Sequence, residues 1–323
     1  MCYNPAVSQR YSYRRGIQAA RRKESSGCSF EICVICVCPR PICRVSTGEK
    51  CVMTTWRLLI TGVSDGATNM AVDQAIMEAV AAETVPPTLR FYAWEPACLS
   101  LGYMQPLADI DRERLVAHGW NLVRRMTGGR SILHTDELTY SVAVKADNPI
   151  VTGSIVESYR NLSRALLWGL HDLGASAGAD KRVEHMPRDR GPVCFEVPSH
   201  YEITVGGKKL VGSAQVRKFG AVLQHGTLPL TGDITRICDA LIFEDDHQRE
   251  TIRERVRRRA ATLEEALGRA IPWDEAVDAM IHGFQETFDL DFATAADLTP
   301  GEQTRAAELC AEQYSSMEWN ARF

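Results

Sequence analysis

The sequence predicts an α+β domain that is followed by a smaller helical region at its C-terminal end. Two observations support this prediction. Up to about residue 230, strand-like runs are interleaved with amphipathic helical stretches, and beyond about residue 232 the pattern is helical alone. The chain has 323 residues, of which 45% are hydrophobic and 24% charged, as is ordinary for a globular protein with a substantial core.

The first half of the main domain reads as strands separated by helices. Trp56 to Thr61 is expected to form a strand, and Asp65 is expected to cap the helix that follows it. The apolar residues of that helix are spaced for one buried face, at Val72, Ala75, Ile76, Ala79 and Val80. Further strands are expected at 89–94, 98–103, 121–126 and 137–144, with a short surface helix at 109–118 and a long amphipathic helix from about 155.

The second half contains a hairpin and then helices. Residues 201–205 and 209–215 are expected to pair around the turn Gly206-Gly207, and 221–230 should continue the sheet. Thr262 with Glu265, and Thr299 with Glu302, match the capping box that begins a helix. We therefore expect a main domain over 53–245, with the helical region 246–323 packed on it.

Residues 1–52 differ from the rest of the chain in composition. They hold nine Lys/Arg against three Asp/Glu, and seven of the eleven cysteines. Cys33 and Cys36 have metal-site spacing without a second pair at a fitting interval, and the basic run from Arg10 to Lys23 is typical of an organellar transit peptide. A third interpretation, which we favour, is that translation begins at Met53. We expect residues 1–52 to be either disordered or not translated.

Charge and cysteine usage argue against several classes of function. The net charge is −4, and residues 53–323 hold 28 Lys/Arg against 38 Asp/Glu, which argues against a nucleic-acid binder. No run of about 18 apolar residues occurs, so no membrane partner is expected. Four cysteines are scattered through this acidic body without framework spacing, as in proteins of the reducing cytosol. We expect a cytoplasmic monomer.

A cysteine and a lysine near the hairpin carry the clearest chemical signal. Cys194 precedes the first hairpin strand, and Lys209 follows the turn fifteen positions later, so the hairpin can bring the two side chains together. The thiolate is the nucleophilic form of cysteine, and a nearby ammonium lowers the pKa of the thiol. Such a pair suits an enzyme that carries an acyl group as a thioester. The alternative is a buried structural cysteine beside a solvated lysine.

A glycine pair flanked by arginines forms a second motif. It reads Arg124-Arg125-Met-Thr127-Gly128-Gly129-Arg130 and is followed by His134. Two glycines at a strand end permit left-handed backbone and let amide N–H groups come close to a ligand. The flanking arginines suit an anionic or carbonyl-bearing group. A purely structural turn is the alternative interpretation.

Together, the motifs resemble the biotin/lipoate protein ligase and transferase superfamily, and most closely its octanoyltransferases of lipoate assembly. The resemblance extends from about Met53 to the last residue, which is why the first 52 residues look foreign. It is carried by Asp65-Gly66, Asn69-Met-Ala71, 89–94, 99–103, 124–134, 137–141, 194–202, 207–215, 223–226 and 314–320.

The resemblance implies a fold, a reaction and a site. The fold is a mixed, mostly antiparallel sheet flanked by helices, with the acyl chain in a tunnel beside the glycine loop. In the implied reaction, the acyltransferase domain 53–245 moves octanoyl from acyl carrier protein to Cys194, then to a lysine of the glycine-cleavage H protein or another lipoyl domain. Cys194 matches the family's nucleophile and Lys209 its partner lysine, and this route requires no ATP, metal or other cofactor. The acyl site is expected to comprise Arg124, Arg125, Thr127, Gly128, Gly129, Arg130, His134, Gly212, Ser213 and Ala214.

Three alternatives to this function stay open. Lipoate ligases of the superfamily use ATP and typically have a third glycine where this chain has Arg130, and they need no cysteine at position 194. Both differences favour the transferase. An amidotransferase that moves octanoyl from the H protein to other lipoyl domains is a variant of the same chemistry. The last alternative is a non-catalytic binder of lipoyl domains or acyl carrier proteins.

Several other residues are expected to be structural. As candidate bases, His134 and His225 lack a spacing that dictates contact with Cys194. Trp319 is expected to anchor the C-terminal segment by packing. The arginine-rich stretch 249–259 is expected to be a solvated helix face, with a docking patch for an acidic protein as the alternative. Core positions are expected for Cys98, Cys238 and Cys310.

Overall fold

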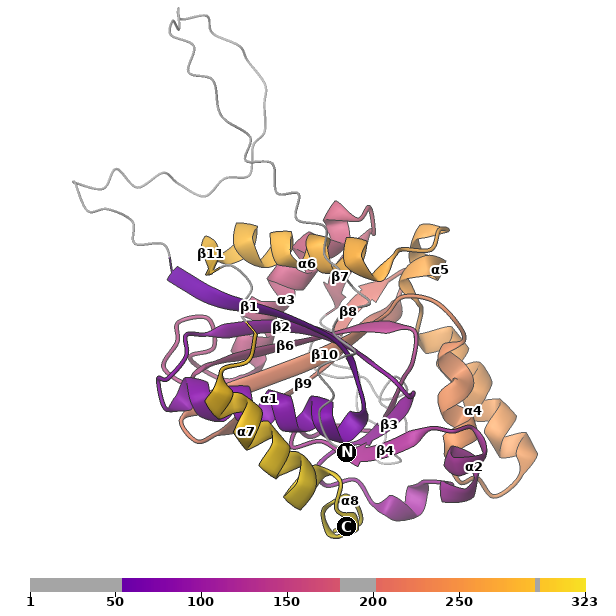
Figure 1. Cartoon of the computed structure of the whole chain (residues 1–323). Coiled ribbons are helices and arrows are strands. Elements are labelled where there is room, and N and C mark those ends of the chain that lie inside the picture. The colour runs from indigo at the N-terminus through magenta and orange to yellow at the C-terminus, as the bar shows by residue number, and fades with distance from the viewer. Residues whose placement is uncertain (1–53, 181–201, 294–296) are drawn as a thin grey trace, which may run out of the picture. The chain divides into compact units, whose positions relative to one another are not determined.

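An eight-stranded mixed sheet forms the centre of the molecule (Figure 1). A computed structural model of the chain describes residues 54–180, 202–293 and 297–323, so the predictions for residues 1–52 and for Cys194 fall outside the described residues. The strand order is β11-β1-β2-β6-β10-β9-β8-β7. These strands are β1 (Thr54–Ser64), β2 (Thr88–Trp94), β6 (Glu137–Lys145), β7 (Ala177–Asp180), β8 (Glu202–Val205), β9 (Lys208–Lys218), β10 (Ala221–Pro229) and β11 (Leu290–Ala293).

The sheet is mixed but mostly antiparallel, as the family resemblance implied. β1 pairs in parallel with both β2 and β11, whereas the other neighbouring strands pair antiparallel. The hairpin predicted around Gly206-Gly207 is confirmed as β8 and β9. β11 corrects the prediction that only helices follow residue 232, because this edge strand comes from the C-terminal region. Its four residues are too few to show an alternating pattern, and their conformation is set by pairing with β1.

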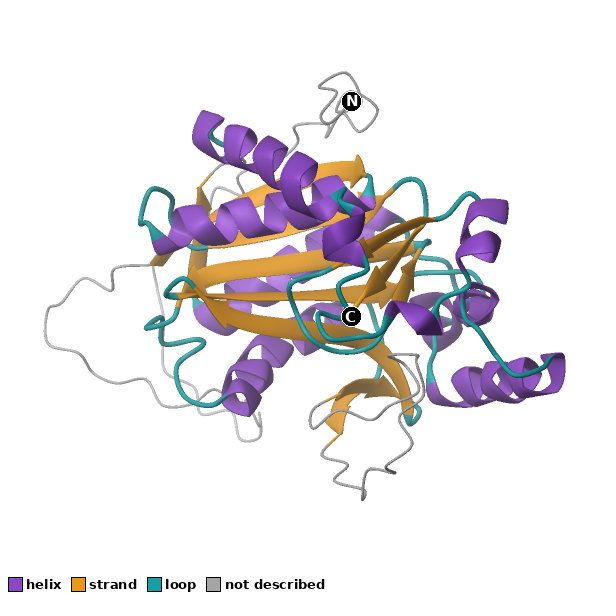
Figure 2. Ribbon diagram, turned by 90° about the horizontal axis from the view of Figure 1, so that it is seen from below, coloured by secondary structure: helices purple, strands orange, loops and turns teal. Residues whose placement is uncertain are grey.

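Helices cover both faces of the sheet (Figure 1). On one face lie α3 and α6, with the shorter α5. On the other face lie α1 and α7, followed by the short helices η4 and α8; Figure 2 views the sheet from this side. The bounds are α1 (Gly66–Ala81), α3 (Ile155–Asp172), α5 (Leu263–Leu267), α6 (Trp273–Phe288), α7 (Pro300–Leu309), η4 (Cys310–Tyr314) and α8 (Met317–Asn320).

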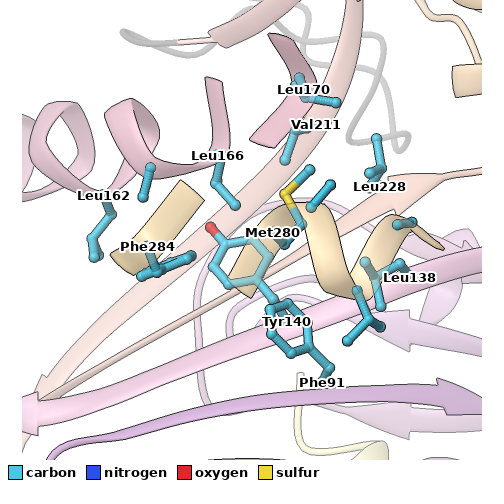
Figure 3. Packing of buried hydrophobic residues seen from close by; sticks show 14 of the residues in the cluster. Phe91, Leu138, Tyr140, Leu162, Leu166, Leu170, Val211, Leu228, Met280 and Phe284 are labelled. Atoms are coloured by element: carbon cyan, nitrogen blue, oxygen red, sulfur yellow. The ribbon is translucent and has the colours of Figure 1, made fainter. Parts of the chain in front are cut away.

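The face under α3 and α6 carries the larger apolar core. Phe91 and Tyr140 project from the sheet toward Leu166 of α3, and toward Met280 and Phe284 of α6 (Figure 3). All five side chains are at most 2% exposed. Burial of aromatic and aliphatic side chains of this size is the main contribution to folding free energy, so this layer gives the sheet a rigid backing.

α1 is buried on more than the one face that its apolar spacing predicts. Asp65 caps it as expected, accepting a hydrogen bond from the Thr68 backbone N–H at 3.0 Å. The helix lies between the sheet on one side and α7 with η4 on the other, so its polar residues Asn69, Asp73 and Gln74 are buried as well. Buried polar groups need partners, and those of α1 lead into the site described below.

A smaller three-stranded sheet lies beside the main one, in the order β4-β3-β5. It packs against α2, η3 and α4 through an apolar cluster that includes Leu101, Leu241 and Val256. At its other side, Trp319 donates to the backbone oxygen of Arg124 at 2.8 Å, which confirms its expected role as an anchor. The bounds are β3 (Cys98–Leu101), η2 (Leu107–Asp109), α2 (Arg112–Ala117), β4 (Asn121–Arg124), β5 (Ile132–His134), η3 (Ile234–Ala240) and α4 (Asp246–Arg259).

Candidate active site

The sheet face that lies against α1 carries a row of buried polar side chains. Side chains alternate between the two faces of a strand, and on β2, β6 and β10 the alternate residues Phe91, Tyr140 and Leu228 face the apolar core. Their neighbours therefore point toward α1. The polar set on this face is Arg90, Tyr92, Trp94, Thr139, Ser141, His225 and Thr227, all at most 6% exposed.

Asp73 of α1 is the centre of this polar layer. Its carboxylate accepts hydrogen bonds from Arg90 Nη1 at 2.7 Å, Ser141 Oγ at 2.8 Å and the Tyr92 hydroxyl at 2.9 Å. Burial opposes ionisation, but the Arg90 guanidinium and the hydrogen bonds from His225 and Ser141 outweigh it and lower the pKa of Asp73 below its ordinary 3.8. Asp73 is therefore a buried carboxylate at neutral pH.

His225 connects this carboxylate to the glycine loop. Its Nδ1 lies 3.0 Å from Asp73 Oδ2, and its Nε2 lies 2.7 Å from the Thr127 hydroxyl oxygen. Burial lowers the pKa of His225 although Asp73 acts to raise it, so the ring is neutral and carries a single N–H. The carboxylate can only accept, which places that N–H on Nδ1. The Thr127 hydroxyl then donates to Nε2.

The glycine loop is fixed by contacts on its buried side and is exposed on its other side. Arg125 Nη2 donates to the carbonyl oxygens of Gly128 at 2.9 Å and of Arg130 at 2.7 Å. Gly129 has a φ of +98°, and a Cβ on Gly102 would lie 2.0 Å from the Gly129 carbonyl oxygen, so both positions require glycine. Gly128 is exposed and has no atom within 4 Å of a Cβ position. Its backbone is thus accessible to a ligand.

His134 is fixed at the far end of the same loop. Its Nε2 lies 2.8 Å from Ser100 Oγ, its Nδ1 lies 2.6 Å from Glu137 Oε1, and its ring stacks on Trp94 with centroids 3.9 Å apart. Arg125 Nη1 also contacts Ser100, at 3.0 Å, so this cluster and the arginine hold one another. With both ring nitrogens engaged and the side chain buried, His134 supports the end of the loop.

Arg124 lies close to the loop in sequence but is directed elsewhere. It is fully buried, and its guanidinium donates to the backbone oxygens of Gly102, Gln105 and Asn320 at 2.7 to 3.2 Å. The structure therefore places Arg124 between the small sheet and the C-terminal turn, where it joins backbone segments. Of the two adjacent arginines, Arg125 is the one that contacts the glycine loop.

Lys209 and Glu202 form a largely buried ion pair at the hairpin. Lys209 Nζ lies 3.0 Å from Glu202 Oε1, and their side chains are 6% and 16% exposed. The backbone of Lys209 is also fixed, because its carbonyl oxygen accepts a hydrogen bond from the Ala261 N–H at 3.0 Å. A lysine anchored at both ends is held at one place in the site.

The small residues of β9 divide between the two faces of the sheet. Gly212 pairs with Thr227 and Ala214 with His225, so both share the polar face of β10. Ser213 points to the opposite face, where its hydroxyl lies 2.8 Å from the Tyr140 hydroxyl. Gly212 and Ala214 therefore lie on the same face as His225, whereas Ser213 belongs to the layer beneath α3.

The structure thus brings Thr127, Gly128, Gly129, Arg125 and His134 together around one loop, and connects that loop to the β10 face.

The sequence interpretation missed three acidic groups of this region, Asp73, Glu137 and Glu202. One signal was available for Asp73, since it lies in the apolar spacing of α1, four residues after Asn69 and three before Ile76. A carboxylate at a core-facing position of a helix indicates a buried polar partner.

The three cysteines of the described ranges are core residues. Cys98, Cys238 and Cys310 are at most 3% exposed, as expected of core residues, and burial raises the pKa of the Cys98 thiol. The described residues contain no group of three or more His, Cys, Asp and Glu side chains that could hold a metal ion. In the same ranges, no helix has the length and apolarity that crossing a membrane requires.

Comparison with protein families gives one match to most of the chain. The family model described as the lipoyl protein ligase A/B catalytic domain matches residues 65–285. Among curated relatives, the octanoyltransferase LipM of Moorella thermoacetica is 44% identical over 274 residues, which is 83% of this chain and 98% of that protein. The octanoyltransferase LipM of Bacillus subtilis is 35% identical over 272 residues, 82% of this chain and 98% of that protein.

Two solved structures with the same fold are lipoate-protein ligases. One is the bipartite lipoate protein ligase of Thermoplasma acidophilum, with a TM-score of 0.68 and 27% identity, covering 83% of this chain and 96% of that one. Another is a lipoate-protein ligase A bound with ATP, with a TM-score of 0.68 and 26% identity, covering 83% of this chain and 98% of that one. These similarities confirm the fold that the motifs implied.

Proposed function

This chain belongs to the lipoyl protein ligase A/B catalytic-domain family, and we propose that it moves octanoyl from acyl carrier protein to a lipoyl-domain lysine through a thioester on Cys194. It is an octanoyltransferase of lipoate biosynthesis. The observation that supports this assignment is its identity of 35–44% to such enzymes over nearly their whole length. The thioester route, the donor and the acceptor lysine are the proposed part. The acceptor is the glycine-cleavage H protein or another lipoyl domain.

In the first step, the Cys194 thiolate attacks the octanoyl thioester of the carrier. A carbon–sulfur bond forms to Cys194, the bond to the carrier's pantetheine sulfur breaks, and the leaving thiolate takes up a proton. The two thiols have similar basicity, so this exchange is close to thermoneutral. Lys209 supports the step, because an ammonium beside the cysteine favours the thiolate.

In the second step, a neutral lysine amine of the acceptor attacks the acyl-enzyme. A carbon–nitrogen bond forms, the bond to Cys194 sulfur breaks, and the amine proton is lost as the thiol is restored. An amide is more stable than a thioester, which drives this step forward. The lysine must lose its proton before it can attack, so a rise in pH should favour the second step.

The ion pair between Lys209 and Glu202 supports the role given to Lys209. A lysine that acts on a thiol must be held in place, and Glu202 Oε1 fixes its ammonium at 3.0 Å while Ala261 fixes its backbone. Cys194 lies eight positions before Glu202 in the sequence. Glu202 is thus proposed to position Lys209.

The exposed glycine loop supports a binding role for Thr127, Gly128 and Gly129. Accessible backbone N–H groups at a loop can stabilise the oxyanion of a tetrahedral intermediate. Arg125 and His225 contact the loop from its buried side, so the loop can keep its shape when a ligand leaves. Gly212 and Ala214 are small residues of the neighbouring strand on the same face as His225.

Transfer assays test this function against its alternatives. Octanoyl-acyl carrier protein is mixed with an apo lipoyl domain or apo H protein in the absence of ATP, and acceptor mass is followed over time. We expect the acceptor to gain one octanoyl group. Octanoylation that requires free octanoate and ATP would instead make the chain a ligase. Transfer only from octanoyl-H protein would make it an amidotransferase.

A further inference from the structure

The arginine-rich helix α4 ends directly beside the candidate catalytic lysine. Ala260, the residue after α4, pairs with Lys209 in a parallel β-bridge, and the next residue, Ala261, donates its N–H to the Lys209 carbonyl oxygen at 3.0 Å. Arg259 is the last residue of the helix. The C-terminal turn of α4 is therefore fixed next to the site by backbone hydrogen bonds.

α4 is a positive element on an acidic body. It holds six arginines against three acidic residues, whereas residues 53–323 together have ten more acidic than basic residues. Val256 is its one buried residue and packs on the small sheet, so most of the helix surface faces solvent. Figure 1 shows α4 at the right of the view, as an outer helix beyond the ends of the strands of the main sheet.

The arginines fall into two groups along the helix. Arg253 binds Asp239 of η3 at 2.7 Å and so holds the helix to its surroundings, whereas Arg249 pairs with Asp246 in the first turn of the same helix. In the last turn, the side chains of Arg257 and Arg258 are 50% and 68% exposed; Arg257 lies 3.3 Å from Glu250 and Arg258 lies 3.7 Å from Glu254, both carboxylates of the same helix. Exposed pairs of this kind are weak and exchange easily with a competing anion.

Complementing the helix dipole does not by itself account for this cluster. Basic residues near a helix C-terminus are stabilising, and every helix could gain from them. Yet α1, α5, α6, α7 and α8 have none in the last turn, while α4 has three consecutive arginines, Arg257 to Arg259. The cluster is concentrated at the one described helix end that is bonded to Lys209.

We propose that the last turn of α4, formed by Arg257, Arg258 and Arg259, is the docking surface for the acidic carrier protein that delivers the acyl thioester. This proposal rests on the function proposed above. A donor that carries its acyl group on a flexible arm must bind beside the site rather than in it. Lys209 gives the location of the site, and the last turn of α4 lies beside Lys209. Charge complementarity between a local positive surface and an acidic partner raises the association rate and orients the partner.

The test compares two donors on a charge-reversed enzyme. In full-length protein, Arg257→Glu, Arg258→Glu and Arg259→Glu are combined, and kcat/KM is measured with octanoyl-acyl carrier protein and with octanoyl-pantetheine, which lacks the protein. A second variant has glutamine at the three positions, which removes the positive charges without reversing them. It keeps the proposal testable if the glutamate variant does not fold. The matched control reverses three basic residues on β6 and α3, the half-exposed Lys145 and the exposed Arg160 and Arg164.

We expect kcat/KM for the carrier to fall by about tenfold or more in the glutamate variant, and less in the glutamine variant. Turnover of octanoyl-pantetheine should be unchanged. Added salt should slow the unmodified enzyme with the carrier but have little effect on the variant, because screening acts on exposed charges. The control triple should behave as the unmodified enzyme does.

Three outcomes would overturn the docking proposal. They are an unchanged kcat/KM for the carrier, an equal loss with both donors, and a change confined to the KM of the acceptor protein. If the unmodified enzyme used neither donor, the function itself would fail, which is distinguishable from a failure of the docking surface.

Discussion

His225 Nε2 lies 2.7 Å from the Thr127 hydroxyl oxygen, so one buried hydrogen bond joins β10 to the glycine loop. The other ring nitrogen of His225 binds Asp73 of α1. The loop is therefore positioned by a helix on the far side of a polar layer, and not by its own residues alone. In an enzyme that must hold an acyl carbonyl against backbone N–H groups, such support determines how well the transition state fits.

Removing the Thr127 hydroxyl should lower activity without unfolding the protein. Thr127→Val keeps the shape but leaves His225 Nε2 without its donor, at a cost of about 1–3 kcal/mol in the free energy of unfolding. A catalytic group displaced by about 1 Å can lose about 100-fold in rate. We expect kcat to fall and KM to change little. Thr127→Ser restores the hydroxyl and should recover most of kcat; equal activity of the Val and Ser variants would contradict the positioning role.

Neutralising Glu202 should slow acyl transfer because Lys209 would lose its anchor. Glu202→Gln preserves size and removes the charge that holds the ammonium at 3.0 Å. We expect kcat/KM to fall by about 10- to 100-fold. The matched control is Glu265→Gln, because Glu265 is 52% exposed and lies 4.0 Å from the neighbouring Lys208. Similar activities of the two variants would show that the buried ion pair has no part in the reaction.

A methyl group at Gly102 should destabilise the fold through the glycine loop. The added Cβ of Gly102→Ala would lie 2.0 Å from the carbonyl oxygen of Gly129, so one of the two backbone segments must move. Overpacking of this kind costs about 1–3 kcal/mol, which thermal unfolding would show as a lower Tm. Gly301→Ala in α7 has no atom within 4 Å of its Cβ and should leave Tm unchanged or slightly raised. An unchanged Tm for Gly102→Ala would be inconsistent with this close approach.

The ion pair of Arg57 and Glu302 should make stability depend on acidic pH. Glu302 accepts from Arg57 at 2.5 and 2.8 Å, and its side chain is 1% exposed. Burial opposes ionisation, but Arg57 and the Thr299 hydrogen bonds outweigh it and lower the pKa of Glu302 below 4.5. A lowered folded-state pKa contributes stability above 4.5 that is lost as pH falls through the folded value.

Urea unfolding at neutral pH, and at steps below pH 4.5, measures this contribution. Glu302→Gln leaves Arg57 buried without its counter-charge and should cost about 3–5 kcal/mol at neutral pH. The difference from the unmodified protein should shrink as the pH falls. A difference that stayed constant across this acidic range would argue against a role for the Glu302 charge in stability.

Elements with a complete local pattern were predictable from the sequence. The alternation over 137–144 and the Asp65 cap gave β6 and α1 within a residue or two, because their signals are contained in their own residues. β11 was missed because its strand conformation depends on pairing with β1, more than 200 positions away in the chain. A short strand takes its geometry from its neighbour.

The candidate site likewise contains some residues that could be predicted from the sequence and others that could not. The glycine pair and its flanking residues were found because they are contiguous in the sequence. Asp73 and Glu202 were not, since their roles arise from contacts with His225 and Lys209 that only the folded chain creates. Arg124 and Arg125 are identical and adjacent in sequence, yet they point to different partners. A strand directs successive side chains to opposite sides, and the sequence alone does not say which side faces the site.

Intact mass spectrometry of the enzyme after mixing with octanoyl-acyl carrier protein, without ATP or acceptor, tests the thioester on Cys194 most directly. We predict that the unmodified protein gains one octanoyl group, that apo lipoyl domain or apo H protein discharges it, and that Cys194→Ala gains none. An unmodified protein that gains no octanoyl group, or a Cys194→Ala variant that gains one as readily as the unmodified protein does, would contradict the mechanism.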